Sequence, residues 1–190
     1  MKHNICLVFL ITSISILAFA PFSAHAANTF KVSSTDINNE HPMTSKQVFQ
    51  GFGCSGDNIS PQLSWYNAPK GTKSYAITVY DPDAPSGSGW WHWTVVNIPA
   101  SVQSLPSGAG DASKPILPSG AIHGRNDFGY SGFGGVCPPV GDKPHRYQVT
   151  VWALGTDKLP VTRDASGAFI GFMLNNNAIA KTVLTATYGR

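Results

Sequence analysis

The chain has 190 residues, a formal net charge of +3 and only 12% charged residues. So small a charge, with no cluster of lysine or arginine in the sequence, argues against nucleic acid as a partner. The 19 glycines and 14 prolines favour a fold rich in turns over one built from long helices.

The N-terminal segment, residues 1–26, has the pattern of a secretory signal peptide. Lys2 precedes an apolar run from Ile5 to Ala20, and Ala24-His25-Ala26 offers small residues to a signal peptidase. The run is shorter than the roughly 20 apolar residues of a membrane-spanning helix, which argues against an uncleaved anchor. We therefore expect cleavage after Ala26, a periplasmic or secreted location, and a single domain over residues 27–190.

Two cysteines, Cys54 and Cys137, follow this segment. In an oxidising compartment, an even pair predicts one disulfide bond. A metal site would call for a Cys-x-x-Cys spacing, and the sequence has none.

In chain order, short runs rich in β-branched and aromatic residues predict strands. These runs cover residues 30–32, 62–65, 75–80, 93–98, 147–154 and 183–188. One helix is predicted over 166–180, where Phe169, Phe172 and Met173 recur at helical spacing and Asp164 or Ser166 supplies the N-cap. The fold predicted is mainly β, an antiparallel β-sandwich with one or two short helices near the C-terminus.

The long connection over residues 99–146 and the loops around it attract attention, because such segments usually carry function. Gly51 to Gly56 matches G-x-G-x-x-G, but no strand–turn–helix unit surrounds it, so we expect no dinucleotide cofactor. Three other segments combine stiff prolines, aromatic rings and titratable side chains. They are Asp81-Pro82-Asp83-Ala84-Pro85, Trp90-Trp91-His92-Trp93, and the stretch from Cys137-Pro138-Pro139 to His145-Arg146-Tyr147.

These segments resemble the signature blocks of the phosphatidylethanolamine-binding protein (PEBP) family, and more narrowly its bacterial Raf-kinase-inhibitor-like branch of YbhB/YbcL type. Asn58-Ile59-Ser60-Pro61 leading to Trp65, and Asn126-Asp127-Phe128-Gly129, fit two further blocks. The resemblance covers essentially all of residues 27–190. It implies a central antiparallel sheet packed on a second sheet, and a small pocket that takes phosphate, acetate, cacodylate or a phospho-headgroup.

The resemblance also assigns residues to that pocket by their positions in the blocks. The pocket residues it implies are Asp81, Pro85, His92, Gly135, Pro138, His145 and Tyr147, with Asp83 and Arg125 at the rim. Animal members often have glycine where this chain has Cys137, so a bond to Cys54 would stiffen the pocket loop.

The chemistry of these residues suits an anion. An imidazole titrates near pH 6.5, so His92 and His145 can each donate a hydrogen bond and gain positive charge beside a bound anion. Asp81 would orient a ring or stabilise the imidazolium. Backbone N–H groups of residues 132–135 would add donors, as in other anion-binding nests.

Other interpretations stay open from the residues alone. The two histidines could be buried structural residues, and Asp83 could simply stabilise its loop. Asp81, His92 and His145, with His123, could hold a metal, although their spacing does not require one. Elsewhere we expect Trp93 in the core, Arg146 in an ion pair, and His41 and His123 in loops or at the surface.

The function predicted is non-enzymatic binding of an anion, with an effect exerted through interaction with, or inhibition of, an unidentified protein such as a host protein or a protease. Neither catalytic residues nor a metal nor a cofactor is expected. The alternative is a hydrolase in which Asp81 with His92 or His145 activates water, against which stands the absence of a G-x-S-x-G, P-loop or H-E-x-x-H motif. Bacterial relatives also suggest a homodimer.

Overall fold

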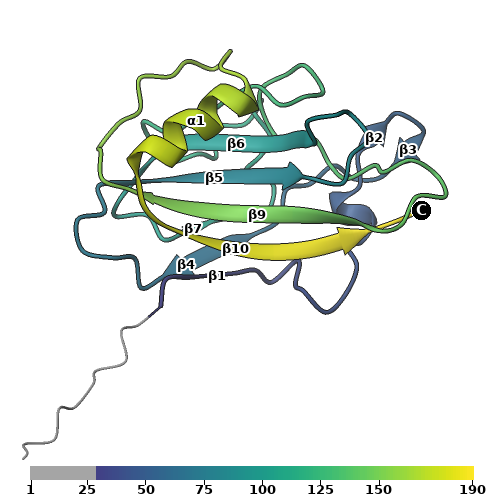
Figure 1. Cartoon of the computed structure of the whole chain (residues 1–190), viewed down its shortest axis with the longest axis horizontal. Coiled ribbons are helices and arrows are strands. Elements are labelled where there is room, and N and C mark those ends of the chain that lie inside the picture. Colours follow the sequence, from purple (N-terminus) through teal and green to yellow (C-terminus); the bar gives the residue numbers. More distant parts are fainter. Residues whose placement is uncertain (1–28) are drawn as a thin grey trace, which may run out of the picture.

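The computed structural model describes residues 29–190, so the predicted signal peptide over residues 1–26 lies outside the described residues. The main element is a five-stranded sheet in the order β10-β9-β5-β6-β8, in which every neighbouring pair is antiparallel (Figure 1). Its strands are β5 (Ser74–Asp81), β6 (Trp90–Pro99), β8 (Ile122–His123), β9 (His145–Leu154) and β10 (Ala178–Tyr188). Four predicted strands are thus confirmed, and each is longer than expected.

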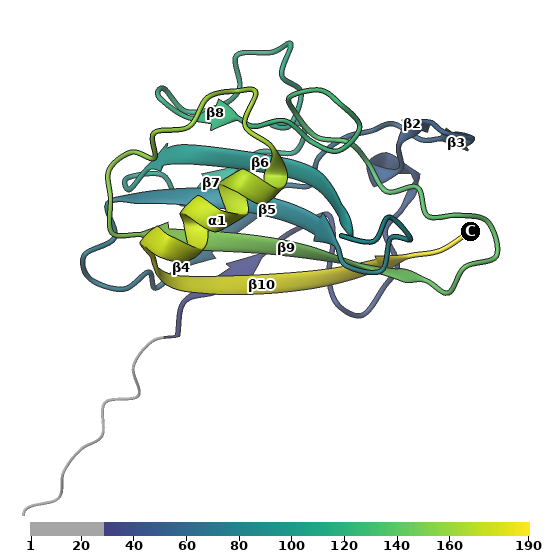
Figure 2. The same ribbon diagram turned by 45° about the horizontal axis from the view of Figure 1, so that its top comes forward.

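A smaller sheet packs against the large one and has the order β1-β4-β7 (Figures 1 and 2). It contains β1 (Lys31–Ser33), β4 (Leu63–Tyr66) and β7 (Ser104–Leu105). The first two match predicted strands to within a residue at each end. A separate short ribbon, β2 (Gln50–Gly51) with β3 (Cys54–Ser55), follows a 3-10 turn at Ser45–Gln47.

The hydrophobic core lies between these two sheets. Leu63 and Trp65 of β4 are buried together with alternate residues of the large sheet, including Ile77, Val95 and Val149. Trp93 is fully buried there, as predicted. Alternation along antiparallel strands sends every second side chain into this layer, which is the arrangement expected of a β-sandwich. The predicted fold class is confirmed.

The opposite face of the large sheet is covered by α1 (Gly167–Asn177), the single α-helix among residues 29–190. The Ser166 hydroxyl caps it by accepting from the N–H of Phe169 at 3.3 Å. The helix ends three residues before the predicted boundary, and β10 begins at once with Ala178 instead of Val183. The β-branched residues that follow favour a strand, and pairing with β9 fixes them in it. Within the described residues, no helix is both long and apolar enough to cross a membrane.

The apolar residues whose spacing predicted α1 do not mark its buried face. Phe169 and Phe172 are exposed by 48% and 64%, whereas Ile170 and Leu174 are fully buried. Gly167 and Gly171 share the buried face, and both lie against the indole of Trp91. Without Cβ atoms these glycines let the helix approach the ring closely, and that contact decides which face turns inward.

The segment between β6 and β9 has little regular structure, as predicted, but it contains one buried histidine. His123 of β8 is only 5% exposed and accepts a hydrogen bond from the Trp93 indole at 3.1 Å. Its predicted place at the surface is therefore wrong, because β8 pairs with β6 and turns the side chain into the sheet. His41 is exposed, as expected.

Cys54 of β3 and Cys137 form the predicted disulfide bond, across a sequence separation of 83 residues. In the chain-entropy model, a loop of this length contributes about 4.5 kcal/mol to the free energy of unfolding. We predict that the Cys54→Ser/Cys137→Ser variant loses up to that amount in urea unfolding. Wild-type protein with a reductant should lose the same amount, and the reductant should leave the variant unchanged. Equal stability of variant and wild type would show that the bond adds nothing to the fold.

The packing of α1 gives a second prediction. A Cβ atom at Gly167 would overlap Cγ of Trp91, whereas one at Gly171 would lie 3.2 Å from Cη2 at the far end of the ring. Gly167→Ala should therefore lower the free energy of unfolding by about 1–3 kcal/mol. Gly171→Ala is the matched control and should stay within about 1 kcal/mol of wild type, since alanine favours the helix. Equal effects of the two substitutions would refute the close contact at Gly167.

Candidate functional site

The candidate site lies at one end of the large sheet, where β5 ends and both β6 and β9 begin. Because the strands are antiparallel, Tyr80 lies opposite Trp91 of β6 and Gln148 of β9, which brings the flanking residues of all three strands together. Four predicted pocket residues meet here with buried side chains, namely Asp81, His92, His145 and Tyr147.

A cavity of about 230 Å³ opens between these residues. Six of the nine predicted site residues line it, and these are Asp81, Pro85, His92, Pro138, His145 and Tyr147. The rest of the lining comes from Phe52, Ala84, Ser86, Trp90, Phe128, Cys137 and Pro139. Residues of all three segments singled out in the sequence thus line the same cavity.

Asp81 orients His145 on the cavity wall. Nδ1 of His145 lies 2.8 Å from Oδ2 of Asp81, and both side chains are almost fully buried. A carboxylate only accepts, so the ring donates its Nδ1–H to Asp81. Nε2 of His145 is the remaining ring nitrogen, and it lies 3.4 Å from Oδ2 of Asp142 near the protein surface.

His92 is held by the backbone of the glycine-rich loop instead of by a carboxylate. Its Nδ1 lies 2.7 Å from the carbonyl oxygen of Gly134 and 3.1 Å from that of Gly135. Carbonyl oxygens only accept, so the proton of a neutral ring resides on Nδ1 and Nε2 carries a lone pair. Burial lowers the pKa of His92, although these carbonyls and the charge of Asp81 oppose that effect.

Three polar atoms of the cavity lining are buried without a hydrogen-bond partner. They are Nε2 of His92, the hydroxyl of Tyr147 and Nε1 of Trp90. Only six side-chain N or O atoms of residues 29–190 are in this state, so half of them gather at one small cavity. Burial also raises the pKa of Tyr147, so its hydroxyl keeps the proton and stays a donor. An unpaired buried polar group costs about 1–3 kcal/mol, a cost that a ligand could remove.

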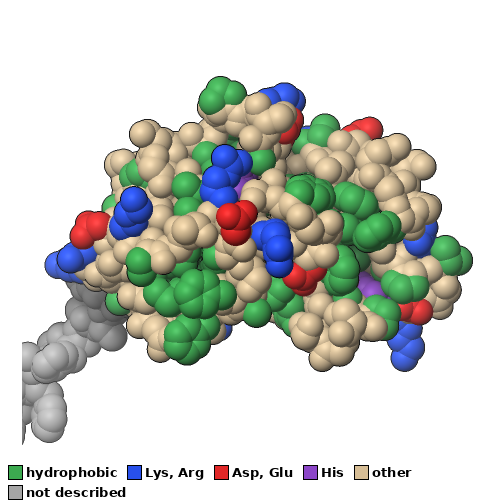
Figure 3. Space-filling model, turned by 90° about the horizontal axis from the view of Figure 1, so that it is seen from above, with side chains coloured by type: hydrophobic (Ala, Val, Ile, Leu, Met, Phe, Trp, Pro, Cys, Tyr) green, Lys and Arg blue, Asp and Glu red, His purple; other side chains and the backbone are tan. Residues whose placement is uncertain are grey.

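Aromatic rings form the apolar side of the cavity. Phe128 stacks on Phe49 with ring centroids 4.1 Å apart, and it also meets Trp90 and His92 edge-on. Phe52, at the turn between β2 and β3, is 69% exposed and contacts Phe128 at 5.5 Å. Figure 3 shows hydrophobic side chains gathered around a histidine on this face of the molecule.

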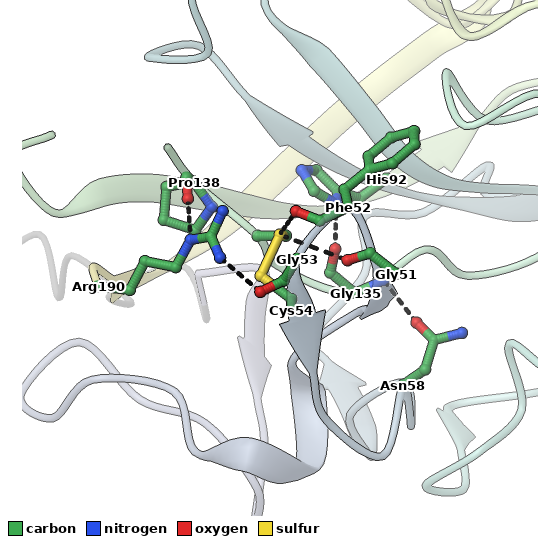
Figure 4. The surroundings of a disulfide bond; sticks show 10 residues. Gly51, Phe52, Gly53, Cys54, Asn58, His92, Gly135, Pro138 and Arg190 are labelled. Carbon is green, nitrogen blue, oxygen red and sulfur yellow. Dashed lines mark hydrogen bonds between the residues drawn. A yellow bond between two sulfur atoms is a disulfide. The ribbon is translucent and has the colours of Figure 1, made fainter. Parts of the chain in front are cut away.

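The loop that carries Pro138 is fastened from several directions (Figure 4). Its disulfide joins it to β3, and Nε of Arg190 donates to the Pro138 carbonyl at 2.6 Å. Nη1 of Arg190 donates to the carbonyl of Gly53 at 2.8 Å, which links the loop to the turn that holds Phe52. The pocket wall and its aromatic rim are therefore tied into one unit.

Gly135 supports the site without lining it. Its N–H donates to Oδ1 of Asn58 at 2.7 Å, and its carbonyl accepts from His92. The N–H of Gly134 bonds to the carbonyl of His92, and that of Phe133 to Gly110. The predicted nest of free N–H groups is therefore wrong, because these donors already hold the loop against the sheet. A Cβ at Gly135 would lie 2.6 Å from the N of Phe49, so this close approach requires glycine.

The two predicted rim residues do not line the cavity either. Asp83 forms an ion pair with Arg146 at 2.6 Å, and this pairing lowers the pKa of Asp83 to about 2. The predicted ion pair of Arg146 is thereby confirmed. The backbone of Arg125 bridges to Ser131 and Ser166, and its side chain is exposed away from the lining. The carboxylate of Asp83 is therefore engaged by Arg146 outside the cavity lining.

The geometry offers no metal centre in the part of the chain that the structure describes, since no three His, Cys, Asp or Glu side chains there are arranged to hold an ion. His123, the fourth ligand considered from sequence, bonds to Trp93 instead.

Sequence reasoning missed several contributors. Phe52 and Ser86 line the cavity, and Arg190 and Asn58 hold its loop. Phe128 and Asn58 belong to segments that resemble family signature blocks, but the resemblance did not indicate what either residue does. No pattern in the sequence pointed to Arg190.

The comparisons with known proteins agree with this architecture. The family model described as "Phosphatidylethanolamine-binding protein" matches residues 33–189. The UPF0098 protein YbcL of Escherichia coli is 59% identical over 92% of this chain and 94% of its own length, and YbhB of the same organism is 45% identical over 83% and 99%. The crystal structure of E. coli YbcL, described as a new member of the mammalian PEBP family, superposes with a TM-score of 0.84 over 85% of this chain and 98% of that one. By sequence and by fold, this chain belongs to the phosphatidylethanolamine-binding protein family.

Proposed function

We propose that this protein is a non-enzymatic binding protein of the periplasm or the extracellular space whose cavity takes an oxyanion, either phosphate or a phospho-headgroup. The observation that carries the proposal is the set of three unpartnered buried polar atoms on the cavity wall. The indole N–H of Trp90 and the hydroxyl of Tyr147 are donors, and Nε2 of His92 becomes one when the ring is protonated. Three donors around a small space suit the oxygens of an anion.

The charges around the cavity support the same conclusion. The carboxylate of Asp81 lines the cavity, and its Oδ2 already accepts a hydrogen bond from Nδ1 of His145. Its negative charge also raises the pKa of His92 against the effect of burial. An anion that enters next to Nε2 would therefore be accompanied by a proton on His92, which offsets one unit of its negative charge.

The aromatic rim of the cavity could contact an organic group attached to the anion, and it could also contact a partner protein. Phe52, Phe128 and Trp90 give an organic group room to lie against apolar surface outside the polar floor. Phe52 is also the most exposed of these rings, and exposed aromatic side chains are common in protein interfaces. We therefore propose that the protein acts by interaction with, or inhibition of, a partner protein such as a host protein or a protease.

The donor geometry predicts how binding depends on pH. Sulfate cannot donate a hydrogen bond, and its charge is constant near neutral pH, so it binds His92 only when Nε2 carries a proton. Above the lowered pKa of His92, sulfate affinity should fall by up to about tenfold for each unit of rising pH. Calorimetric titration of wild-type protein between about pH 5.5 and 8 measures this slope.

The matched variant is His92→Gln, whose amide can donate without titrating. It should bind sulfate more weakly, and the slope of log affinity against pH should drop by about one. An unchanged slope in His92→Gln, with the variant folded, would remove His92 from the site. No saturable binding of sulfate or phosphate at millimolar concentration would refute the proposed function.

One observation favours a hydrolase, namely the Asp81–His145 pair, which could act as a base toward water. Against it, the Ser86 hydroxyl in the cavity donates to the carbonyl of Gly89 and is not paired with a histidine. We expect no turnover of chromogenic phosphoesters or carboxylic esters above the buffer rate. Turnover by the purified protein that disappears in His145→Ala would establish the hydrolase instead.

A further inference from the structure

A second group of polar side chains lies on the β8 side of the large sheet, around His123. Nδ1 of His123 accepts from Nε1–H of Trp93 at 3.1 Å. An indole nitrogen can only donate, so the lone pair of the ring must be on Nδ1 and the proton on Nε2. His123 therefore offers a fixed N–H donor at Nε2, for which no hydrogen-bond partner is found among residues 29–190.

A surface hollow of about 280 Å³ begins at this ring. It shares no lining residue with the first cavity, so the two are separate sites. Its walls are made mainly of prolines, small residues and two aliphatic side chains, together with Lys114, His123 and Arg163. On this face of the molecule, Figure 3 shows a histidine beside Lys or Arg side chains, apart from the histidine that lies among hydrophobic ones.

The two cations of the hollow differ in how they are engaged. Lys114 forms an ion pair with Asp111 at 3.0 Å, so part of its charge is neutralised. The guanidinium of Arg163 makes no ion pair with any acidic side chain of residues 29–190, although its backbone carbonyl accepts from Ser131. Arg163 also lies close enough to His123 to lower its pKa, while Asp111 opposes this.

We propose that this hollow is a second oxyanion site, in which a carboxylate or phosphate group binds between Arg163 and Lys114 and accepts the Nε2–H of His123. The fork of the guanidinium suits two oxygens of one such group. The imidazole supplies the third hydrogen bond from a position fixed by Trp93, and the proline walls limit the size of the ligand.

The two sites would bind anions by different means. Burial and Arg163 lower the pKa of His123 to about 4, so the ring donates as a neutral group at every pH near neutrality. Here the positive charge comes from Arg163, which stays protonated. In the first cavity, by contrast, the charge arrives with a proton on His92.

The indole N–H signals in ¹⁵N–¹H spectra can test this proposal, because each site has its own reporter. Trp93 bonds directly to His123, whereas Trp90 lines the first cavity. Acetate and inorganic phosphate are titrated separately at about pH 7, and the chemical shift of the Trp93 indole N–H is measured in each titration. A saturable shift with acetate indicates a carboxylate ligand, and one with phosphate alone indicates a phosphate group. A Trp93 shift that persists when Trp90 does not respond would support this site even if the proposed function fails.

Arg163→Gln should lower the affinity for the anion, measured from the Trp93 signal, by about tenfold or more, because it removes a charge-assisted contact. Lys114→Gln should weaken it less, since Asp111 shares that charge. Lys158→Gln removes one exposed cation outside the hollow and should leave the titration curve of the Trp93 signal unchanged. A Trp93 shift that does not saturate at millimolar ligand, or that is identical in Arg163→Gln and wild type, would overturn the proposal.

Discussion

The register of the three central strands is the constraint on which the site depends. Tyr80 pairs with Trp91 on one side and with Gln148 on the other, so the C-terminal end of β5 lies between the N-terminal ends of β6 and β9. A shift of one residue in either pairing would turn the corresponding histidine to the opposite face of the sheet. That register is itself fixed by burial, because β5 is covered on one face by the smaller sheet and on the other by α1. The polar floor of the cavity is thus a consequence of apolar packing along the rest of the same strands.

Within this frame, the two histidines are positioned by chemically different partners. His145 donates to a carboxylate, and His92 donates to two backbone carbonyls of the loop at Gly134 and Gly135. In both arrangements Nδ1 is engaged in a hydrogen bond, so Nε2 is the remaining nitrogen of each ring. The loop that holds His92 is in turn held by Asn58, by the disulfide and by Arg190. Residues far apart in the sequence therefore decide the orientation of one imidazole ring.

Much of the fold and most of the cavity floor could be predicted from the sequence. Alternating β-branched residues identified the central strands, and the resemblance of three segments to family signature blocks pointed to Asp81, His92 and His145. The helix face could not be predicted, because Gly167 and Gly171 carry no hydrophobic signal although their contact with Trp91 decides the packing. Gly135 and Asp83 lie near the cavity as expected but do not line it. The local sequence does not show that the N–H of Gly135 already bonds to Asn58 and that the carboxylate of Asp83 already pairs with Arg146. The role of a long-range partner such as Arg190 could not be predicted, because it produces no periodicity or residue spacing in the sequence.

The exposed ring of Phe52 has a consequence for how this pocket could diversify. It projects from a two-residue turn with φ near +52°, on a ribbon that the disulfide and Arg190 attach to the pocket wall from outside. None of the polar atoms of the floor bonds to that side chain. Substitution at this position can therefore alter the shape and selectivity of the entrance while the charge chemistry beneath it is preserved. The proposed recognition of an anion by the floor and of its attached group by the entrance would thus be separable traits, open to independent evolutionary or engineered change.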